Sequence, residues 1–181
     1  MARSPDEPEP IVTLRDGRAV IVRELTPGDE AEVARLVGAS ADARLSFYER
    51  SAQQRGAEAS GETPSAAFVA LISADQRIVG YATYLAVDEQ DGELAGVVDP
   101  AFAGIGLGTL LVRRAAEHAR LTGLETLHVD LHPGSEDTAA MIRDSGFPSH
   151  WDLAYPVARV ELLLGRTRPG WSTPEYPPAE E

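Results

Sequence analysis

The spacing of apolar residues along the chain predicts strands and helices in alternation between residues 11 and 165. The clearest helix covers residues 107–121, where apolar side chains recur every three or four positions. One face of this helix carries Leu107, Leu110, Leu111, Ala115, His118 and Ala119. Shorter helices are predicted to begin at Thr26 and to cover residues 40–50 and 136–144. Strands are predicted at residues 11–14, 19–22, 67–72, 78–85, 93–98, 124–131 and 157–164.

Local turn signals connect these segments. Asp16 followed by Gly17 between two apolar runs is typical of a β-hairpin. Thr26 is a typical helix cap, and a proline follows it at the first helical position. Because strand pairs both precede and follow helices, we expect an α/β (α+β) fold with a mixed, mostly antiparallel sheet flanked by helices.

The length of the chain favours one folded domain. The sequence has 181 residues, and we expect the domain to span residues 11–165. Residues 1–10 and 166–181 together hold seven of the 13 prolines and few aliphatic side chains. Such segments bury too little apolar surface to offset the entropy lost on ordering, so we expect both to be disordered tails.

Charge and cysteine content narrow the function. All 16 basic residues are arginine, and 29 acidic residues bring the net charge to −13. This charge repels phosphate backbones and anionic lipids, so we expect neither nucleic acid nor membrane as a partner, and a cationic substrate is favoured. Cysteine is absent, which excludes disulfides, thiolate metal sites and a cysteine nucleophile. The N-terminus lacks the apolar stretch of a signal peptide, so we expect a cytoplasmic protein.

The motif richest in chemistry is a glycine turn between a predicted strand and the 107–121 helix. Glycines at 104, 106 and 108 allow backbone N–H groups to face outward, and the helix start adds partial positive charge, which together favour an anion site. The dinucleotide-binding motif fails because Thr109 and Leu111 stand where it needs glycine, and a P-loop fails because the chain has no lysine. The alternative is a tight turn that holds no ligand.

This segment resembles the pyrophosphate-binding motif of the GNAT superfamily of acyl-CoA-dependent N-acyltransferases. Residues 98–100 (Val-Asp-Pro) and 106–108 (Gly-Leu-Gly) match that motif. The similarity extends to residues 23–29, which lead into the first helix, and to Ser-Gly-Phe at 145–147. Leu-Arg-Asp-Gly at 14–17, followed by residues 40–48, is most similar to the protein-lysine acetyltransferase (Pat-type) branch.

The resemblance implies particular contacts with acetyl-CoA as acyl donor, and no metal. Backbone groups on the strand would bind the pantetheine amides, and these belong to Gly96, Val97 and Val98. Backbone N–H groups of the turn would hold the pyrophosphate, and these belong to Gly104, Ile105, Gly106, Leu107, Gly108 and Thr109. Two positions depart from the family pattern. Ala103 stands where the family has glutamine or arginine, and Ile105 stands where a basic residue is common, so side-chain contacts with phosphate are missing.

Glu93 is the candidate general base. It lies ten residues before Ala103, which matches the glutamate that acts as base in the protein acetyltransferase branch. The alternative is a solvated carboxylate at the start of a strand. His132 is a second candidate, and it shares a strand face with His128 and Asp130, which we interpret as a polar face in preference to a metal site.

A general acid for the departing thiolate is not evident in the sequence. Many relatives use a tyrosine on the helix predicted at 136–144, which here has none, and Tyr81, Tyr84 and Tyr155 are alternatives.

The resemblance therefore implies an N-acyltransferase that moves an acetyl or short acyl group from acyl-CoA to an amine, either a small molecule or a protein lysine. Without cysteine, direct attack in a ternary complex is expected. The alternative is a catalytically degenerate acyl-CoA-binding or regulatory domain, which Ala103, Ile105 and the missing tyrosine favour.

Overall fold

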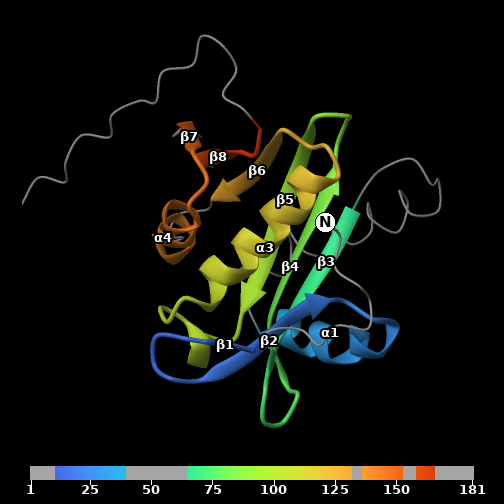
Figure 1. Ribbon diagram of the computed structural model, residues 1–181, viewed down its shortest axis with the longest axis vertical. Helices are drawn as coiled ribbons and strands as arrows, with labels where there is room; N and C mark the ends of the chain where they lie inside the picture. Colours follow the sequence, from blue (N-terminus) through green and yellow to red (C-terminus); the bar gives the residue numbers. More distant parts are fainter. Residues whose placement is uncertain (1–10, 40–64, 132–135, 153–157, 166–181) are drawn as a thin grey trace, which may run out of the picture.

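The residues that the structure describes form one eight-stranded sheet with the strand order β1-β2-β3-β4-β5-β6-β8-β7 (Figure 1). The computed structural model describes residues 11–39, 65–131, 136–152 and 158–165. The strands are β1 (Ile11–Thr13), β2 (Ala19–Glu24), β3 (Ser65–Ile72), β4 (Ile78–Ala86), β5 (Asp91–Val98), β6 (Thr126–Leu131), β7 (Ser149–Asp152) and β8 (Ala158–Leu163). Among these strands, β5 and β6 form the one parallel pair, and all other neighbours are antiparallel. The predicted mixed, mostly antiparallel sheet is confirmed.

The helices lie on both faces of the sheet. The described α-helices are α1 (Glu30–Ala39), α3 (Leu107–Leu121) and α4 (Glu136–Asp144), with 3₁₀ turns η1 (Pro27–Asp29) and η2 (Pro100–Phe102). Val33, Leu36 and Val37 of α1 pack on one sheet face, and the apolar side of α3 packs on the other face together with Ile142 of α4. The bounds of α3 and α4 agree with the sequence prediction, because both helices have clear apolar periodicity.

The sequence prediction differs from the structure at one strand, and parts of it fall outside the described residues. The strand β7 was not predicted, because its sequence Ser-His-Trp-Asp has no apolar alternation and it pairs only with β8 at the sheet edge. The predicted helix at 40–50 and the predicted tails at 1–10 and 166–181 lie outside the described residues. In the part of the chain that the structure describes, no helix is both long and apolar enough to span a membrane.

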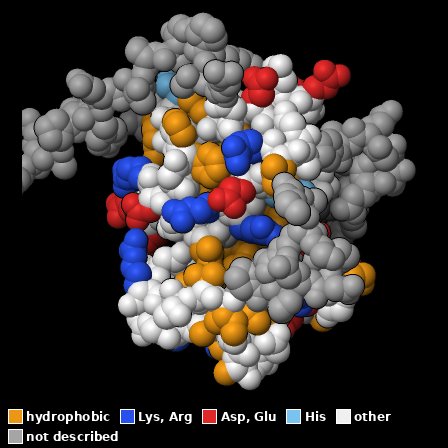
Figure 2. Space-filling view, in the orientation of Figure 1, with side chains coloured by type: hydrophobic (Ala, Val, Ile, Leu, Met, Phe, Trp, Pro, Cys, Tyr) orange, Lys and Arg blue, Asp and Glu red, His pale blue; other side chains and the backbone are white. Residues whose placement is uncertain are grey.

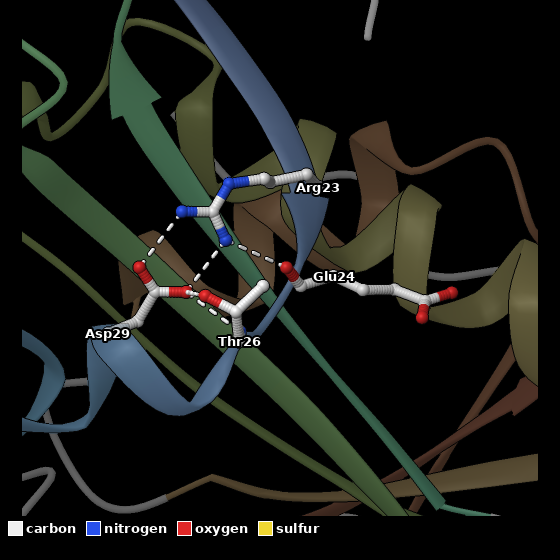
Figure 3. A network of polar contacts seen from close by, with 4 residues as sticks. All are labelled: Arg23, Glu24, Thr26 and Asp29. Atoms are coloured by element: carbon white, nitrogen blue, oxygen red, sulfur yellow. Dashed lines mark hydrogen bonds and ion pairs between the residues drawn. The ribbon is translucent and has the colours of Figure 1, made fainter. Parts of the chain in front are cut away.

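The start of α1 is held by a partly buried ion pair between β2 and η1. Both guanidinium NH groups of Arg23 donate to the carboxylate of Asp29, at 2.7 and 2.9 Å (Figure 3). The backbone N–H and the hydroxyl of Thr26 each donate to the same carboxylate at 2.8 Å. These hydrogen bonds, chiefly those from Arg23, hold the pKa of Asp29 well below its usual range. The capping role predicted for Thr26 is thus one part of a larger network.

Replacing Asp29 tests how much this network contributes to stability. Asp29→Asn should lower the free energy of unfolding at pH 7 by about 2 kcal/mol, because hydrogen bonds to a charged group are lost and Arg23 is left partly buried. A lowered native pKa gives stability that is present above about pH 4 and lost as the pH falls further. Urea unfolding at pH 7 and pH 3 should therefore show a smaller pH dependence in Asp29→Asn than in the wild type.

Glu32→Gln is the matched control, because Glu32 forms an exposed ion pair with Arg35 at 3.6 Å. Its effect on the free energy of unfolding should stay below about 1 kcal/mol. An equal loss in the two variants would contradict a special role for Asp29.

Candidate functional site

An opening between β5 and β6 defines the candidate site. The two strands pair over three positions only, Asp91 with Thr126, Gly92 with Leu127 and Glu93 with His128. Beyond Glu93, β5 stays paired with β4 as far as Val98, while β6 remains paired with β8 (Figure 1). The second half of β5 therefore has a sheet edge with no ladder partner on β6. This is the splay at which a peptide-like ligand can add hydrogen bonds to the strand.

The residues predicted to bind pantetheine lie on this edge of β5, which beyond Glu93 pairs with no strand among the described residues. Gly96 is exposed, Val97 is buried in the core beneath α1, and Val98 is half-buried. A Cβ at Gly96 would lie 2.9 Å from the carbonyl oxygen of Tyr81, so a larger residue would push β5 away from β4. The sequence placed these three residues correctly on the strand that leads into the glycine turn.

The glycine turn lies at the end of the opening and leads directly into α3. Gly104 and Gly106 have positive φ angles of 72° and 97°, which favour glycine. The backbone N–H of Leu110 is bonded to the oxygen of Gly106, so the N–H groups of Leu107, Gly108 and Thr109 have no acceptor within the helix. A Cβ at Gly104 would meet no atom within 4 Å. The turn thus leaves room for an anion beside N–H groups that have no acceptor within the helix and beside the positive end of α3, whose first turn has no acidic residue.

The third glycine of the motif serves a different purpose. Gly108 is buried, and a Cβ there would lie 1.7 Å from the sulfur of Met141 on α4. Its missing side chain therefore allows α3 and α4 to pack closely, while its backbone N–H still belongs to the first turn of α3. The sequence alone had grouped the three glycines together.

Glu93 lies at the apex of the opening, as the last residue of β5 that pairs with β6. Its register partners are Leu85 on β4 and His128 on β6, and its side chain is half-buried. Asp130 on β6, with a smaller contribution from Glu93, raises the pKa of Arg159 on β8. A carboxylate at the apex, beside the free edge of β5, is placed to meet a group that enters the opening.

A row of titratable side chains continues from Glu93 across the sheet. His128 pairs in register with Glu161 on β8, and Glu161 pairs with His150 on β7. The Nδ1 atom of His128 lies 3.8 Å from Glu161 Oε1, and its Nε2 atom lies 3.7 Å from Asp91 Oδ1. Glu161 Oε2 lies 3.6 Å from His150 Nδ1. His128 and Asp130 lie on one half-buried face of β6, as the sequence predicted, whereas His132 of the same predicted face lies outside the described residues.

The other candidates from the sequence were a metal site, a histidine base and a tyrosine acid. No group of three metal-ligating side chains is found among the residues that the structure describes. His132 and Tyr155 lie outside the described ranges. Tyr84 is buried on the α3 side of the sheet, where its hydroxyl bonds His118 Nδ1 at 2.9 Å and Thr122 Oγ1 at 3.2 Å, and burial raises its pKa. Its hydroxyl therefore lies at the C-terminal end of α3, away from the glycine turn.

Two arginines lie next to the glycine turn, and the sequence did not predict that they would. The backbone N–H of Arg15, in the β1–β2 loop, donates to the carbonyl of Ile105 at 3.2 Å. Arg18 donates to the carbonyl of Ala101 at 2.8 Å and stacks 3.8 Å above the Phe102 ring. Arginine and acidic side chains are interspersed over the face formed by α3 and α4 (Figure 2). Nothing in the local sequence links the β1–β2 hairpin to a turn 90 residues later. The contact between the two can therefore be recognised only in the folded structure.

Comparisons with known proteins agree on one family. The profile of the Acetyltransferase (GNAT) family matches residues 34–147. The mycothiol acetyltransferase of Nocardia farcinica is 34% identical over 168 residues, which cover 86% of this chain and 54% of that protein. The chain thus spans about half the length of this curated relative.

Solved structures show the same fold. The GNAT domain of S. lividans PAT superposes with a TM-score of 0.65 at 19% identity, covering 89% of this chain and 99% of that one. yncA, a putative acetyltransferase from Salmonella typhimurium solved with acetyl-CoA, superposes with a TM-score of 0.60 at 18% identity, covering 82% of this chain and 95% of that one.

The contact between Gly108 and Met141 can be tested by stability. Gly108→Ala should lower the free energy of unfolding by up to about 1 kcal/mol, because the overlap of the added methyl group with the flexible end of the Met141 side chain outweighs the helix propensity that alanine gains. The double variant Gly108→Ala/Met141→Ala should recover part of this loss when compared with Met141→Ala alone. Urea denaturation measures both. Wild-type stability in Gly108→Ala would show that α3 and α4 do not constrain this position.

Proposed function

The chain belongs to the GNAT acetyltransferase family, and we propose that it transfers an acetyl or short acyl group from acyl-CoA to an amine by direct attack in a ternary complex. The amine belongs either to a small molecule or to a protein lysine. One observation carries this proposal: the opening between β5 and β6 leads directly to the glycine turn and the N-terminus of α3. The edge of β5 is thus followed by a helix end that favours anions. An elongated thioester with phosphate groups at one end fits this order, because its amide-bearing arm would lie along the strand and its phosphates at the helix.

The residues present fit acetyl-CoA. The backbone of Gly96, Val97 and Val98 offers hydrogen bonds to the pantetheine amides along the free edge of β5. The N–H groups of residues 104–109 would hold the pyrophosphate, where Gly104 leaves open space. When bound, the thioester supplies an activated acyl carbonyl and a thiolate leaving group.

Glu93 supplies the base in this proposal. An amine is protonated near neutral pH and must lose a proton before its nitrogen can attack, and the Glu93 carboxylate accepts that proton directly or through one water. Support comes from the place of Glu93 at the apex, where β5 leaves β6. The nearby carboxylates of Asp91 and Glu161 and the net charge of −13 favour a cationic acceptor.

A second candidate function has a specific observation in its favour. The helix α4 holds no tyrosine, and the hydroxyl of Tyr84 is bonded to His118 and Thr122. A domain that binds acyl-CoA without transferring the acyl group would have no use for a general acid. Coenzyme A thiolate is a good leaving group, however, so transfer does not depend on such an acid. Binding of acetyl-CoA without acylation of any amine or lysine peptide in a broad panel would favour the second function.

The glycine turn can be tested by placing a charge in it. Gly104→Asp and Gly104→Asn introduce side chains of equal size, and both residues tolerate a positive φ. The aspartate should weaken acetyl-CoA binding at least tenfold more than the asparagine, because only the carboxylate repels phosphate. Isothermal titration calorimetry measures the two dissociation constants, and circular dichroism checks the fold. Equal affinities would contradict a phosphate site at this turn.

Glu93→Gln tests the proposed base. It keeps the shape and removes the basicity, so acetyl-CoA should still bind while turnover falls by roughly 10²–10⁴-fold. Raising the pH should restore part of the rate, because more of the amine is then deprotonated in solution. Thiol release during incubation with the amine panel measures turnover.

Glu125→Gln is the matched control, because Glu125 is exposed and precedes β6 outside the opening. It should leave turnover unchanged. Full activity in Glu93→Gln together with loss in His132→Ala would assign the base to the histidine instead.

A further inference from the structure

The glycine turn has no charged side chain of its own, although one lies next to it. Residues 100–106 read Pro-Ala-Phe-Ala-Gly-Ile-Gly, so the positions at which the family carries glutamine, arginine or another basic residue hold Ala103 and Ile105. The side chain of Arg15 lies beside this turn. The atoms nearest to a Cβ built on Gly106 are Arg15 Nε at 3.9 Å and Arg15 Cγ at 4.0 Å.

The backbone holds Arg15 in this place. Its N–H donates to the carbonyl of Ile105, and the neighbouring Arg18 donates to the carbonyl of Ala101. The guanidinium of Arg18 also pairs with Asp16 and stacks on Phe102. The β1–β2 loop is thus bonded to the glycine turn at two points, and the Arg15 side chain is the more exposed of its two arginines, at 67% against 37%.

The positive charges around Arg15 favour the binding of an anion. The N-terminus of α3 carries partial positive charge, so a guanidinium beside it is repelled. The partner of Arg15 among the described residues is Asp144 of α4, at 3.4 Å, with the two side chains 67% and 52% exposed. An exposed pair of this length contributes little. A phosphate group between the guanidinium and the N–H groups of α3 would remove the repulsion and bond both.

We propose that Arg15 contacts a phosphate group of acyl-CoA at the N-terminus of α3 and replaces the side chains missing at Ala103 and Ile105. The inference rests on the proposed function, since it concerns the same ligand. Coenzyme A has two phosphate sources, the pyrophosphate and the 3′-phosphate of the adenosine, and both offer oxygens that a guanidinium binds. Asp144 pairs weakly with Arg15 in the free protein and competes with the phosphate for it.

Calorimetric titration with acetyl-CoA tests this assignment without any acceptor. Arg15→Gln should raise the dissociation constant about tenfold or more, and Asp144→Asn should lower it severalfold, because a competing carboxylate is removed. The double variant should lose the gain of Asp144→Asn. Arg15→Gln should also reduce the dependence of binding on salt concentration. Arg120→Gln is the matched control, since Arg120 is exposed at the far end of α3, and it should bind as the wild type does.

Two truncated ligands separate the phosphate sources. If Arg15 contacts the pyrophosphate, Arg15→Gln weakens binding of coenzyme A and 3′-dephospho-coenzyme A by the same factor. If Arg15 contacts the 3′-phosphate, the effect disappears with the dephospho form. Either result supports the assignment, whereas an equal effect on pantetheine, which has no phosphate, would overturn it.

The outcome also separates this inference from the proposed function. Wild-type affinity in Arg15→Gln, with binding weaker in Gly104→Asp than in Gly104→Asn, would overturn the role of Arg15 and leave the proposed function standing. Failure of the wild-type protein to bind acetyl-CoA would overturn both. Because the Arg15 side chain is exposed, Arg15→Gln should fold normally, which urea unfolding verifies.

Discussion

The parallel pairing of β5 with β6 is the constraint on which the rest of the site depends. Parallel neighbours need a crossover connection, and here that connection is α3, which begins beyond the end of β5 and returns the chain to the start of β6. The N-terminus of α3 therefore lies at the edge where β5 ends. Because the pairing covers only three positions, the two strands part on the way to that edge. The crossover from β5 through α3 to β6 therefore places the N-terminus of α3 at the same end of β5 as the opening.

Charge is distributed unevenly around this opening, although the chain as a whole is strongly acidic. Arg15 and Arg18 lie beside the glycine turn, at the end that would receive phosphate groups. Asp91, Glu93 and Glu161 lie near the apex, on the sheet face opposite α3. Each group also has neighbours of opposite charge, since Asp144 and Asp16 pair with the two arginines and Arg159 lies within electrostatic reach of Glu93. This separation comes from sheet register and loop docking, because the residues involved are spread over the whole chain.

The elements with local periodicity were all visible in the sequence. The bounds of α3 and α4 follow from apolar spacing, and the hairpin follows from Asp16 and Gly17, because these signals depend on residues a few positions apart. The strand β7 was invisible for the same reason: it has no apolar alternation, and its stability comes from pairing with β8. Register across β6, β8 and β7, which brings His128, Glu161 and His150 into one row, also depends on pairing between distant segments.

The candidate site likewise has features that local sequence predicts and features that depend on tertiary contacts. The sequence by itself determined that a glycine turn connects a strand to a helix and that Glu93 precedes it on that strand, since both statements concern one continuous segment. Only the tertiary structure decided that Gly106 faces the open turn whereas Gly108 faces α4, because which side of a backbone is covered depends on what packs there. It also decided that Arg15 lies beside Gly106. A hairpin loop and a helix start 90 residues apart meet because the sheet positions them, and no periodicity in either segment records that contact.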